Sequence, residues 1–309
     1  MPDPTIARAA IIGPGLIGSS LARALRKAGL VKTLTAFDRN SEISERAKTI
    51  GAVDEVAPDF AVAVKDTQLI VLATPVGAIT ELCALLNTHA MPGALIIDVG
   101  SVKGAIAEAA TNLRQDLYFV PSHPVAGTEQ SGPEAGFAEL FEDRWCILTP
   151  LARNDDGYLD AVERVSQLWK GVGAHVEIMN AAHHDLALAV TSHLPHLIAF
   201  TLVGAADDIE SVAQAEVVKY SAGGFRDFTR IAASDPVMWR DVFLNNKEAI
   251  LEVLGRFSEE LALMQRAIRW DDGEALHEAF TRGRSLRQAI VEAGQETAEP
   301  NFGRDKEGH

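Results

Sequence analysis

The feature that most constrains the fold is a glycine motif near the N-terminus. RAAIIG (8–13) predicts a strand and LIGSSLARALRKAGL (16–30) predicts a helix, and the GPGLIG between them has the G-x-G-x-x-G spacing. In that spacing Gly13 permits a tight turn, Gly15 lets a phosphate approach the backbone, and Gly18 lets the helix pack on the strand. The free N–H groups at the helix N-terminus favour an anion, so the motif predicts the start of a dinucleotide-binding α/β domain.

A second predicted strand, TLTAF (33–37), ends directly before Asp38, which can accept hydrogen bonds from ribose hydroxyls. Asp38 would repel the 2′-phosphate of NADP, so NAD is the predicted cofactor, while the adjacent Arg39 keeps NADP open as an alternative. Thr74 and Pro75 follow another strand and would reach the same sheet edge, although an ordinary strand-to-helix turn explains them almost as well. The predicted cofactor-binding residues are Gly13, Gly15, Leu16, Ile17, Gly18, Asp38, Arg39, Thr74 and Pro75.

Short apolar runs alternate with helical patterns over the first 180 residues. Runs that are apolar on both faces and linked by helices predict a mostly parallel sheet covered on both sides, which is a doubly wound fold. The further strand candidates lie at 68–75, 93–100, 117–122, 144–150 and 174–179.

The pattern changes after residue 180, where no convincing strand follows and the long segments 181–206, 236–269 and 273–295 have helical spacing. We therefore expect a doubly wound Rossmann-type α/β domain followed by an all-α domain that binds substrate and forms a homodimer. The expected bounds are 1–180 for the first domain, 181–297 for the second and 298–309 for a loose polar tail.

Charge and composition argue against several classes of partner. The formal net charge of −15 repels nucleic acid and anionic membranes, and the N-terminus lacks a secretory signal. No run was found to reach the roughly 18 apolar residues of a membrane span. The two cysteines, Cys83 and Cys146, have apolar neighbours typical of buried thiols in a reducing compartment. We expect a cytoplasmic protein without nucleic-acid or membrane partners.

Two polar residues follow strands of the predicted sheet. Ser101 in DVGSVKG either caps a helix or points its hydroxyl into the crevice, and both can hold at once. His123 in SHPVAGTEQSG would lie on the same rim in an irregular loop, where a histidine suits the removal of a hydroxyl proton. Lys103 is a candidate general acid, with a solvated lysine in the first turn of a helix as the alternative.

The helical half carries a second group of candidates. His193 and His196 in TSHLPHLIAF share one face if the helix continues through Pro195, which is expected to kink or interrupt it. A metal site would need a further ligand, and HHD (183–185) does not share a face with these two histidines, so no metal is expected.

Arginines gather in SAGGFRDFTRIAASDPVMW (221–239), where Gly223 and Gly224 break the helical pattern. The planar fork of an arginine matches a carboxylate, and an acidic protein needs such a group to hold an anionic substrate. Arg226 could bind the carboxylate, although a surface ion pair with Asp227 is the commoner outcome for such a residue.

The motifs DVGSVKG, SHPVAGTEQSG, SHLPH and GGFRDFTRIA together resemble the TyrA-type prephenate/arogenate (cyclohexadienyl) dehydrogenases, from Ile11 to about residue 295. The resemblance implies NAD(P)-dependent oxidative decarboxylation of a cyclohexadienyl substrate in tyrosine biosynthesis. It implies His123 as general base, Ser101 as its hydrogen-bonding partner or that of the substrate hydroxyl, and Arg230 as carboxylate anchor. It further implies substrate-site roles for His196 or His193 or both, Glu129, Gly223, Gly224, Asp227 and Trp239, with Asp227 and Trp239 near the dimer partner's site.

The glycine motif starts at Gly13, which leaves no room before it for a chorismate mutase domain, and no ferredoxin-like regulatory domain follows the helices. We therefore expect a monofunctional enzyme. Two rivals share the glycine motif. A β-hydroxyacid or imine-reducing dehydrogenase would not require His123 together with Arg230, and a non-catalytic NAD sensor would require neither.

Overall fold

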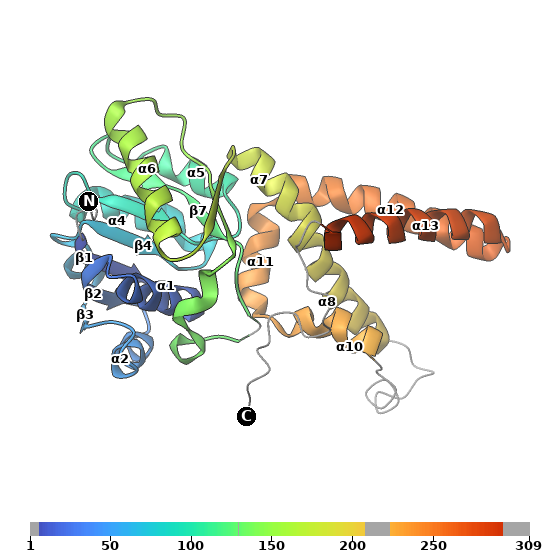
Figure 1. Cartoon of the computed structure of the whole chain (residues 1–309), viewed down its shortest axis with the longest axis horizontal. Helices are drawn as coiled ribbons and strands as arrows, with labels where there is room; N and C mark the ends of the chain where they lie inside the picture. Colours follow the sequence, from blue (N-terminus) through green and yellow to red (C-terminus); the bar gives the residue numbers. More distant parts are fainter. Residues whose placement is uncertain (1–5, 129, 208–222, 293–309) are drawn as a thin grey trace. The chain divides into compact units, whose positions relative to one another are not determined.

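The computed structural model describes residues 6–128, 130–207 and 223–292 (Figure 1). The chain divides into two compact units, 1–251 and 252–309. The strands are β1 (Ile6–Ile12), β2 (Val31–Phe37), β3 (Glu55–Val56), β4 (Leu69–Leu72), β5 (Leu95–Asp98), β6 (Tyr118–Val120), β7 (Ser122–Pro124), β8 (Trp145–Leu148) and β9 (His175–Ile178). The helices of the first half are α1 (Leu16–Lys27), α2 (Ser41–Thr49), α3 (Phe60–Val64), α4 (Ile79–His89), α5 (Gly104–Ala110) and α6 (Asp156–Gly171). Those that follow are α7 (Ala181–Leu188), a π-helical turn (Ala189–His193), α8 (Leu194–Asp207), α10 (Gly223–Thr229), α11 (Pro236–Asn245), α12 (Lys247–Arg269) and α13 (Gly273–Glu292).

Six parallel strands form the central sheet in the order β3-β2-β1-β4-β5-β6. Alternate residues of each strand enter two different cores, as the two-residue period of a strand requires. Ile11 packs on the face covered by α1 and α6, whereas Ile12 packs on the face covered by α3, α4 and α5. Burial on both faces explains why these strands are uninterrupted apolar runs, and the predicted doubly wound fold is confirmed.

The later strands do not all join this sheet. A separate three-stranded sheet has the order β7-β8-β9, with β7 antiparallel to β8. The expectation that residues 122–124 form an irregular loop was wrong, because the backbone of His123 is paired with Ile147 in this second sheet. Strand β3 was also not anticipated, since two residues carry no periodicity.

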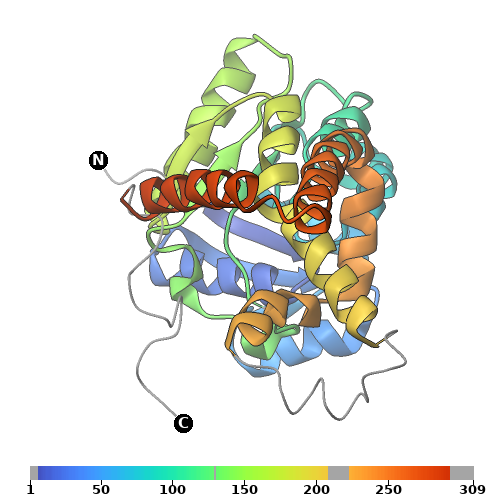
Figure 2. The ribbon, with the colours of Figure 1, turned by 90° about the vertical axis from the view of Figure 1, so that its right-hand side faces the viewer.

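The described residues after Ile178 form only helices and turns, as the sequence indicated. The α7 segment, the π-helical turn and α8 form one continuous helical run, and Figures 1 and 2 both show α11 beside it. By length and composition alone the run Ala181–Ala206 reaches the range of a membrane span, contrary to the sequence reading. Core helices of water-soluble proteins pass the same test, so this is weak evidence for a membrane.

Pro195 does not break that run. A proline lacks the N–H that would bond four residues back, and its ring crowds that position. The position four residues before Pro195 falls within the wider π-helical turn Ala189–His193, which accommodates the ring without a break. The expected interruption at Pro195 does not occur, and His193 and His196 both lie against Trp239.

The second unit contains most of α12 and all of α13. Arg282 and Glu260 join these helices through an ion pair of 3.1 Å between nitrogen and oxygen. Several large apolar side chains of this unit are more than half exposed, which bears on assembly: Leu261, Leu263, Ile268, Trp270, Phe280 and Leu286.

Candidate active site

The glycine motif has the geometry of a dinucleotide cradle. Gly13 has a φ of +87°, and a Cβ there would lie 2.6 Å from the carbonyl oxygen of Ala73, so only glycine fits. Gly18 is equally closed, because a Cβ would collide with the carbonyl oxygen of Gly13. In contrast, a Cβ on Gly15 would meet no atom within 4 Å. The two outer glycines close the turn, and the middle one leaves open space where a pyrophosphate would approach the start of α1.

The other predicted cofactor residues surround this turn. Asp38 follows the last residue of β2 directly, and burial raises the pKa of its carboxyl group. Arg39 forms an ion pair with Glu81 on α4. The hydroxyl of Thr74 is buried and has no hydrogen-bonding partner among the described residues, which fits a polar ligand at this position. Pro75 precedes a short 3-10 helix, Val76–Ala78. These residues fit the dinucleotide that the motif predicts.

A buried ion pair shapes the chain where β6 turns into β7. Lys103 Nζ contacts the Asp98 carboxylate and donates a 2.7 Å hydrogen bond to the carbonyl oxygen of Ser122, and both charged side chains are fully buried. The N–H of Ser122 donates to the other Asp98 oxygen at 3.0 Å. Asp98 and Lys103 thus hold both backbone groups of the residue before His123.

Lys103 therefore has neither role that the sequence suggested. A general acid must reach the substrate, and a solvated lysine must reach water, whereas Lys103 is 0% exposed and its ammonium is paired. Burial lowers the pKa of Lys103, and the neighbouring Asp98 opposes that shift. Its function in the fold is to hold the bend that carries His123.

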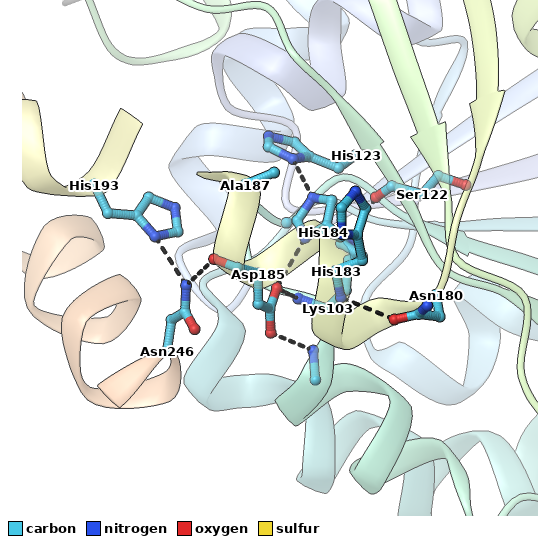
Figure 3. A network of polar contacts seen from close by, with 12 residues as sticks. Lys103, Ser122, His123, Asn180, His183, His184, Asp185, Ala187, His193 and Asn246 are labelled. Carbon is cyan, nitrogen blue, oxygen red and sulfur yellow. Dashed lines mark hydrogen bonds and ion pairs between the residues drawn. The ribbon is translucent and has the colours of Figure 1, made fainter. Parts of the chain in front are cut away.

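His123 is 7% exposed and is hydrogen-bonded through Nδ1 to Nε2 of His184, at 2.8 Å (Figure 3). His184 Nδ1 in turn lies 2.8 Å from Oδ1 of Asp185. The Asp185 carboxylate also accepts the backbone N–H groups of Lys103 at 2.8 Å and Gly104 at 2.7 Å, at the start of α5. Helix α7 therefore supplies a continuous hydrogen-bonded chain behind His123.

His193 and His196 lie against one aromatic side chain. Trp239 of α11 stacks on His196 with ring centroids 3.7 Å apart and meets His193 edge-on at 6.1 Å. Nδ2 of Asn246 donates to the Asp185 carbonyl oxygen at 2.9 Å and to Nδ1 of His193 at 3.1 Å (Figure 3). His193 must then carry its hydrogen on Nε2, which is buried and has no hydrogen-bonding partner among the described residues. This N–H is available to a ligand.

Burial sets the charge of all these imidazoles. Desolvation lowers the pKa of His123 well below its ordinary value, and its electrostatic interactions with His184, Lys103 and His193 lower it further. Burial likewise lowers the pKa of His184, of His196 and, to about 4, of His193. Arg230, in the 3-10 helix Arg230–Ala233, also lowers the pKa of His196. Neutral imidazoles beside one arginine suit proton removal from an anionic substrate.

The remaining predicted substrate residues are less enclosed. Ser101 lies in the turn after β5, and the expectation that it caps the following helix was wrong, because Lys103 occupies the N-cap position of α5. Gly223 and Gly224 begin α10, and the residues that precede them lie outside the described part of the chain. Asp227 pairs with the exposed Arg226 at 3.5 Å. Glu129 lies outside the described residues.

Sequence reasoning missed the roles of several residues, namely Asp98, His184, Asp185 and Asn246. His184 and Asp185 were considered only as metal ligands. Among residues 6–128, 130–207 and 223–292, no group of three His, Cys, Asp or Glu side chains is placed to hold a metal. The glycine at position 104 is the one sequence feature that fits the Asp185 contact, because a Cβ there would lie 2.8 Å from Asp185 Oδ2.

Comparison with known proteins shows the family to which the chain belongs. The sequence model described as prephenate dehydrogenase, nucleotide-binding domain, matches residues 21–178. The model described as prephenate dehydrogenase, dimerization domain, matches residues 180–282. Together they cover most of the chain.

Individual proteins show the same similarity. The chain is 40% identical over 281 residues to a cyclohexadienyl dehydrogenase of Zymomonas mobilis, covering 91% of this chain and 95% of that protein. It is 35% identical to a prephenate dehydrogenase of Bacillus subtilis, covering 91% and 75%. A crystal structure of Aquifex aeolicus prephenate dehydrogenase with hydroxyphenyl propionate and NAD+ superposes with a TM-score of 0.84 at 34% identity, covering 93% and 99%. Synechocystis arogenate dehydrogenase gives a TM-score of 0.75 at 28% identity, covering 92% and 99%.

Proposed function

This chain belongs to the prephenate dehydrogenase family, and we propose that its own residues carry out the family's oxidative decarboxylation with His123 as base and Arg230 as carboxylate anchor. The protein is an NAD-dependent oxidoreductase of tyrosine biosynthesis. The observation that carries the proposal is the buried His123, which follows the carboxyl end of β6 at the sheet edge where the glycine cradle follows β1. Because the chain belongs to this family, we do not propose the two alternative functions, which were a β-hydroxyacid or imine-reducing dehydrogenase and an NAD sensor.

NAD, when bound, accepts the hydride from the ring carbon that carries the hydroxyl group. His123 Nε2 takes the hydroxyl proton, so the C–O bond becomes a carbonyl conjugated with the ring. The bond to the ring carboxylate then breaks, CO2 leaves, and its electron pair enters the ring to give a phenolate. The phenolate oxygen takes the proton back from the His123 imidazolium, which gives the phenol and restores the base. Aromatisation makes the reaction effectively irreversible. The chain needs to supply only a base, a carboxylate anchor and a fixed orientation.

The pKa of His123 determines the expected pH dependence. A base with a lowered pKa is unprotonated at neutral pH and becomes inactive only when the pH falls through that lowered value. We expect kcat/KM to stay constant on the acid side down to a pH clearly below the ordinary histidine pKa of about 6.5. The pH profile of kcat/KM measures this, and an acid limb at or above about 6.5 would contradict a desolvated His123 as the base.

The anchor is proposed from the surroundings of Arg230. Its guanidinium lies near His196, which stacks on Trp239, and His193 offers a buried N–H beside the same tryptophan. An arginine binds a carboxylate through two parallel hydrogen bonds, while the neutral rings line the apolar part of a pocket. We propose that Ser101, Glu129, Gly223 and Asp227 complete the substrate site.

Arg230→Ala should raise KM for the cyclohexadienyl substrate about 10- to 100-fold with a smaller change in kcat, because a charge-assisted hydrogen bond contributes roughly 1.5–3 kcal/mol. Steady-state kinetics at saturating NAD measure the effect. Arg226→Ala is the matched control, since Arg226 is exposed and pairs with Asp227. If Arg226→Ala raises KM and Arg230→Ala does not, Arg226 is the anchor.

The substrate is prephenate, L-arogenate or both, and the products are 4-hydroxyphenylpyruvate and L-tyrosine respectively. Relatives are named for each of these activities. The test is NADH formation by the purified protein with each substrate in separate assays, repeated with NADP. The ratio of kcat/KM values identifies the preferred substrate and cofactor. Absence of turnover under all four conditions contradicts the proposal.

The chain carries the family's dimerisation domain, and we propose a homodimer formed through residues 181–297, with 1–180 as the nucleotide-binding domain. Exposed apolar side chains in α12 and α13 support this, because a monomer rarely leaves so many large apolar groups in water. Trp239 stacks on His196 of the same chain, so only Asp227 is proposed to lie near the partner's site. We further propose a cytoplasmic location, which follows from the class of enzyme.

A further inference from the structure

We propose that His184 and Asp185 are positioning residues that hold His123 as the tautomer with its hydrogen on Nδ1, leaving Nε2 as the free base. This inference rests on the proposed role of His123. It explains why Nε2 of His123, and not Nδ1, would accept the substrate proton.

The carboxylate of Asp185 can only accept hydrogen bonds. Oδ1 of Asp185 is 2.8 Å from Nδ1 of His184, so this nitrogen must carry the hydrogen. His184 is fully buried, and burial lowers its pKa, so the ring is neutral and holds a single hydrogen. Its Nε2 is therefore an acceptor.

The acceptor role of His184 determines which nitrogen of His123 carries the hydrogen. Its Nδ1 lies 2.8 Å from the acceptor Nε2 of His184, and two lone pairs cannot share a hydrogen bond. His123 Nδ1 must therefore be the donor. His123 is also neutral because of its lowered pKa, so its Nε2 carries a lone pair. The opposite tautomer would present an N–H to the substrate and could not accept the proton.

The orientation of Asp185 is itself fixed by the fold. Both of its oxygens accept backbone N–H groups at the start of α5, and Asn246 binds its carbonyl oxygen. A Cβ at position 104 would collide with Oδ2, so the glycine there permits this approach. The carboxylate cannot rotate without leaving the N–H groups of Lys103 and Gly104 unpaired, which opposes any other orientation.

The same chain of hydrogen bonds supports the charged state that follows proton removal. When Nε2 of His123 takes the proton, the ring becomes a cation and its Nδ1–H becomes a stronger donor to His184. His184 connects this cation to the negative charge of Asp185. Of the other groups that face the ring, Lys103 is paired with Asp98, and His193 is neutral because burial lowers its pKa to about 4.

The test compares three variants of the full-length protein with NAD bound. His184→Met removes the acceptor at similar size, and we expect kcat to fall about 10- to 100-fold with KM and NAD affinity unchanged. His184→Gln keeps an amide oxygen that can accept from His123, and we expect it to recover most of the lost kcat. His183→Met is the matched control, because His183 is the adjacent residue of α7 and is exposed. We expect wild-type kinetics from it.

The tautomer is measured independently of turnover by ¹⁵N NMR of histidine-labelled protein, with the His123 signals assigned by their loss in His123→Asn. We expect hydrogen on Nδ1 of His123 in the wild type and a mixture of tautomers in His184→Met. Hydrogen on Nε2 in the wild type, or His184→Met kinetics equal to those of His183→Met, would overturn the inference. If His123→Asn leaves turnover unchanged, the proposed base is wrong, whereas the NMR result still reports on the tautomer.

Discussion

His123→Asn should lose about 10²–10⁴-fold in kcat while the affinity for NAD stays near that of the wild type. The size of the loss follows from the contribution of a general base to a step in which hydride and proton leave the same C–OH group. NAD affinity should persist because the glycine cradle is formed by β1 and α1, which do not involve His123. Steady-state kinetics and an NAD titration measure the two quantities separately.

The matched control is His89→Asn, which changes an exposed histidine at the end of α4. It should leave kcat and NAD affinity unaltered. A loss of kcat in His123→Asn accompanied by weakened NAD binding would indicate a disturbed fold instead of a missing base. Full turnover in His123→Asn would remove this residue from the mechanism.

Lys103→Met should lower the free energy of unfolding by about 3–5 kcal/mol, the usual cost of removing one partner from a buried ion pair. The remaining Asp98 carboxylate would stay buried with only backbone N–H groups to stabilise its charge. The intact pair gives little net stability, because burial lowers the pKa of Lys103 in spite of the attraction of Asp98. Urea unfolding measures the loss.

Two variants separate this explanation from a general effect of losing a lysine. Lys27→Met removes an exposed lysine that pairs with Glu139 and Glu142, and we expect no measurable change in the unfolding midpoint. The double variant Asp98→Asn, Lys103→Met should recover part of the stability, since no unpaired charge remains. If the loss in free energy of unfolding of the double variant equals the sum of the losses of the two single variants, the ion-pair explanation is refuted.

The sequence alone determined the features that have local causes. The glycine spacing at 13–18 requires a tight turn between a strand and a helix, and strands apolar at every position require a sheet that is buried on both faces. The change to helical spacing after residue 180 similarly follows from periodicity. These features depend on neighbours within one or two turns of the chain, and the structure confirms each of them.

Only the tertiary structure decided what surrounds His123. The contact with His184 joins residues 61 positions apart, and Asp185 caps α5 across 82 and 81 positions. No periodicity links such positions, because the meeting of α7, α5 and β7 depends on how the whole sheet and its helices pack. The same holds for Lys103, which looked like a solvated residue of a first helical turn until Asp98 and Ser122 were seen to enclose it. The sequence singled out His123, and the packing of distant elements determines which of its nitrogen atoms is hydrogen-bonded to His184.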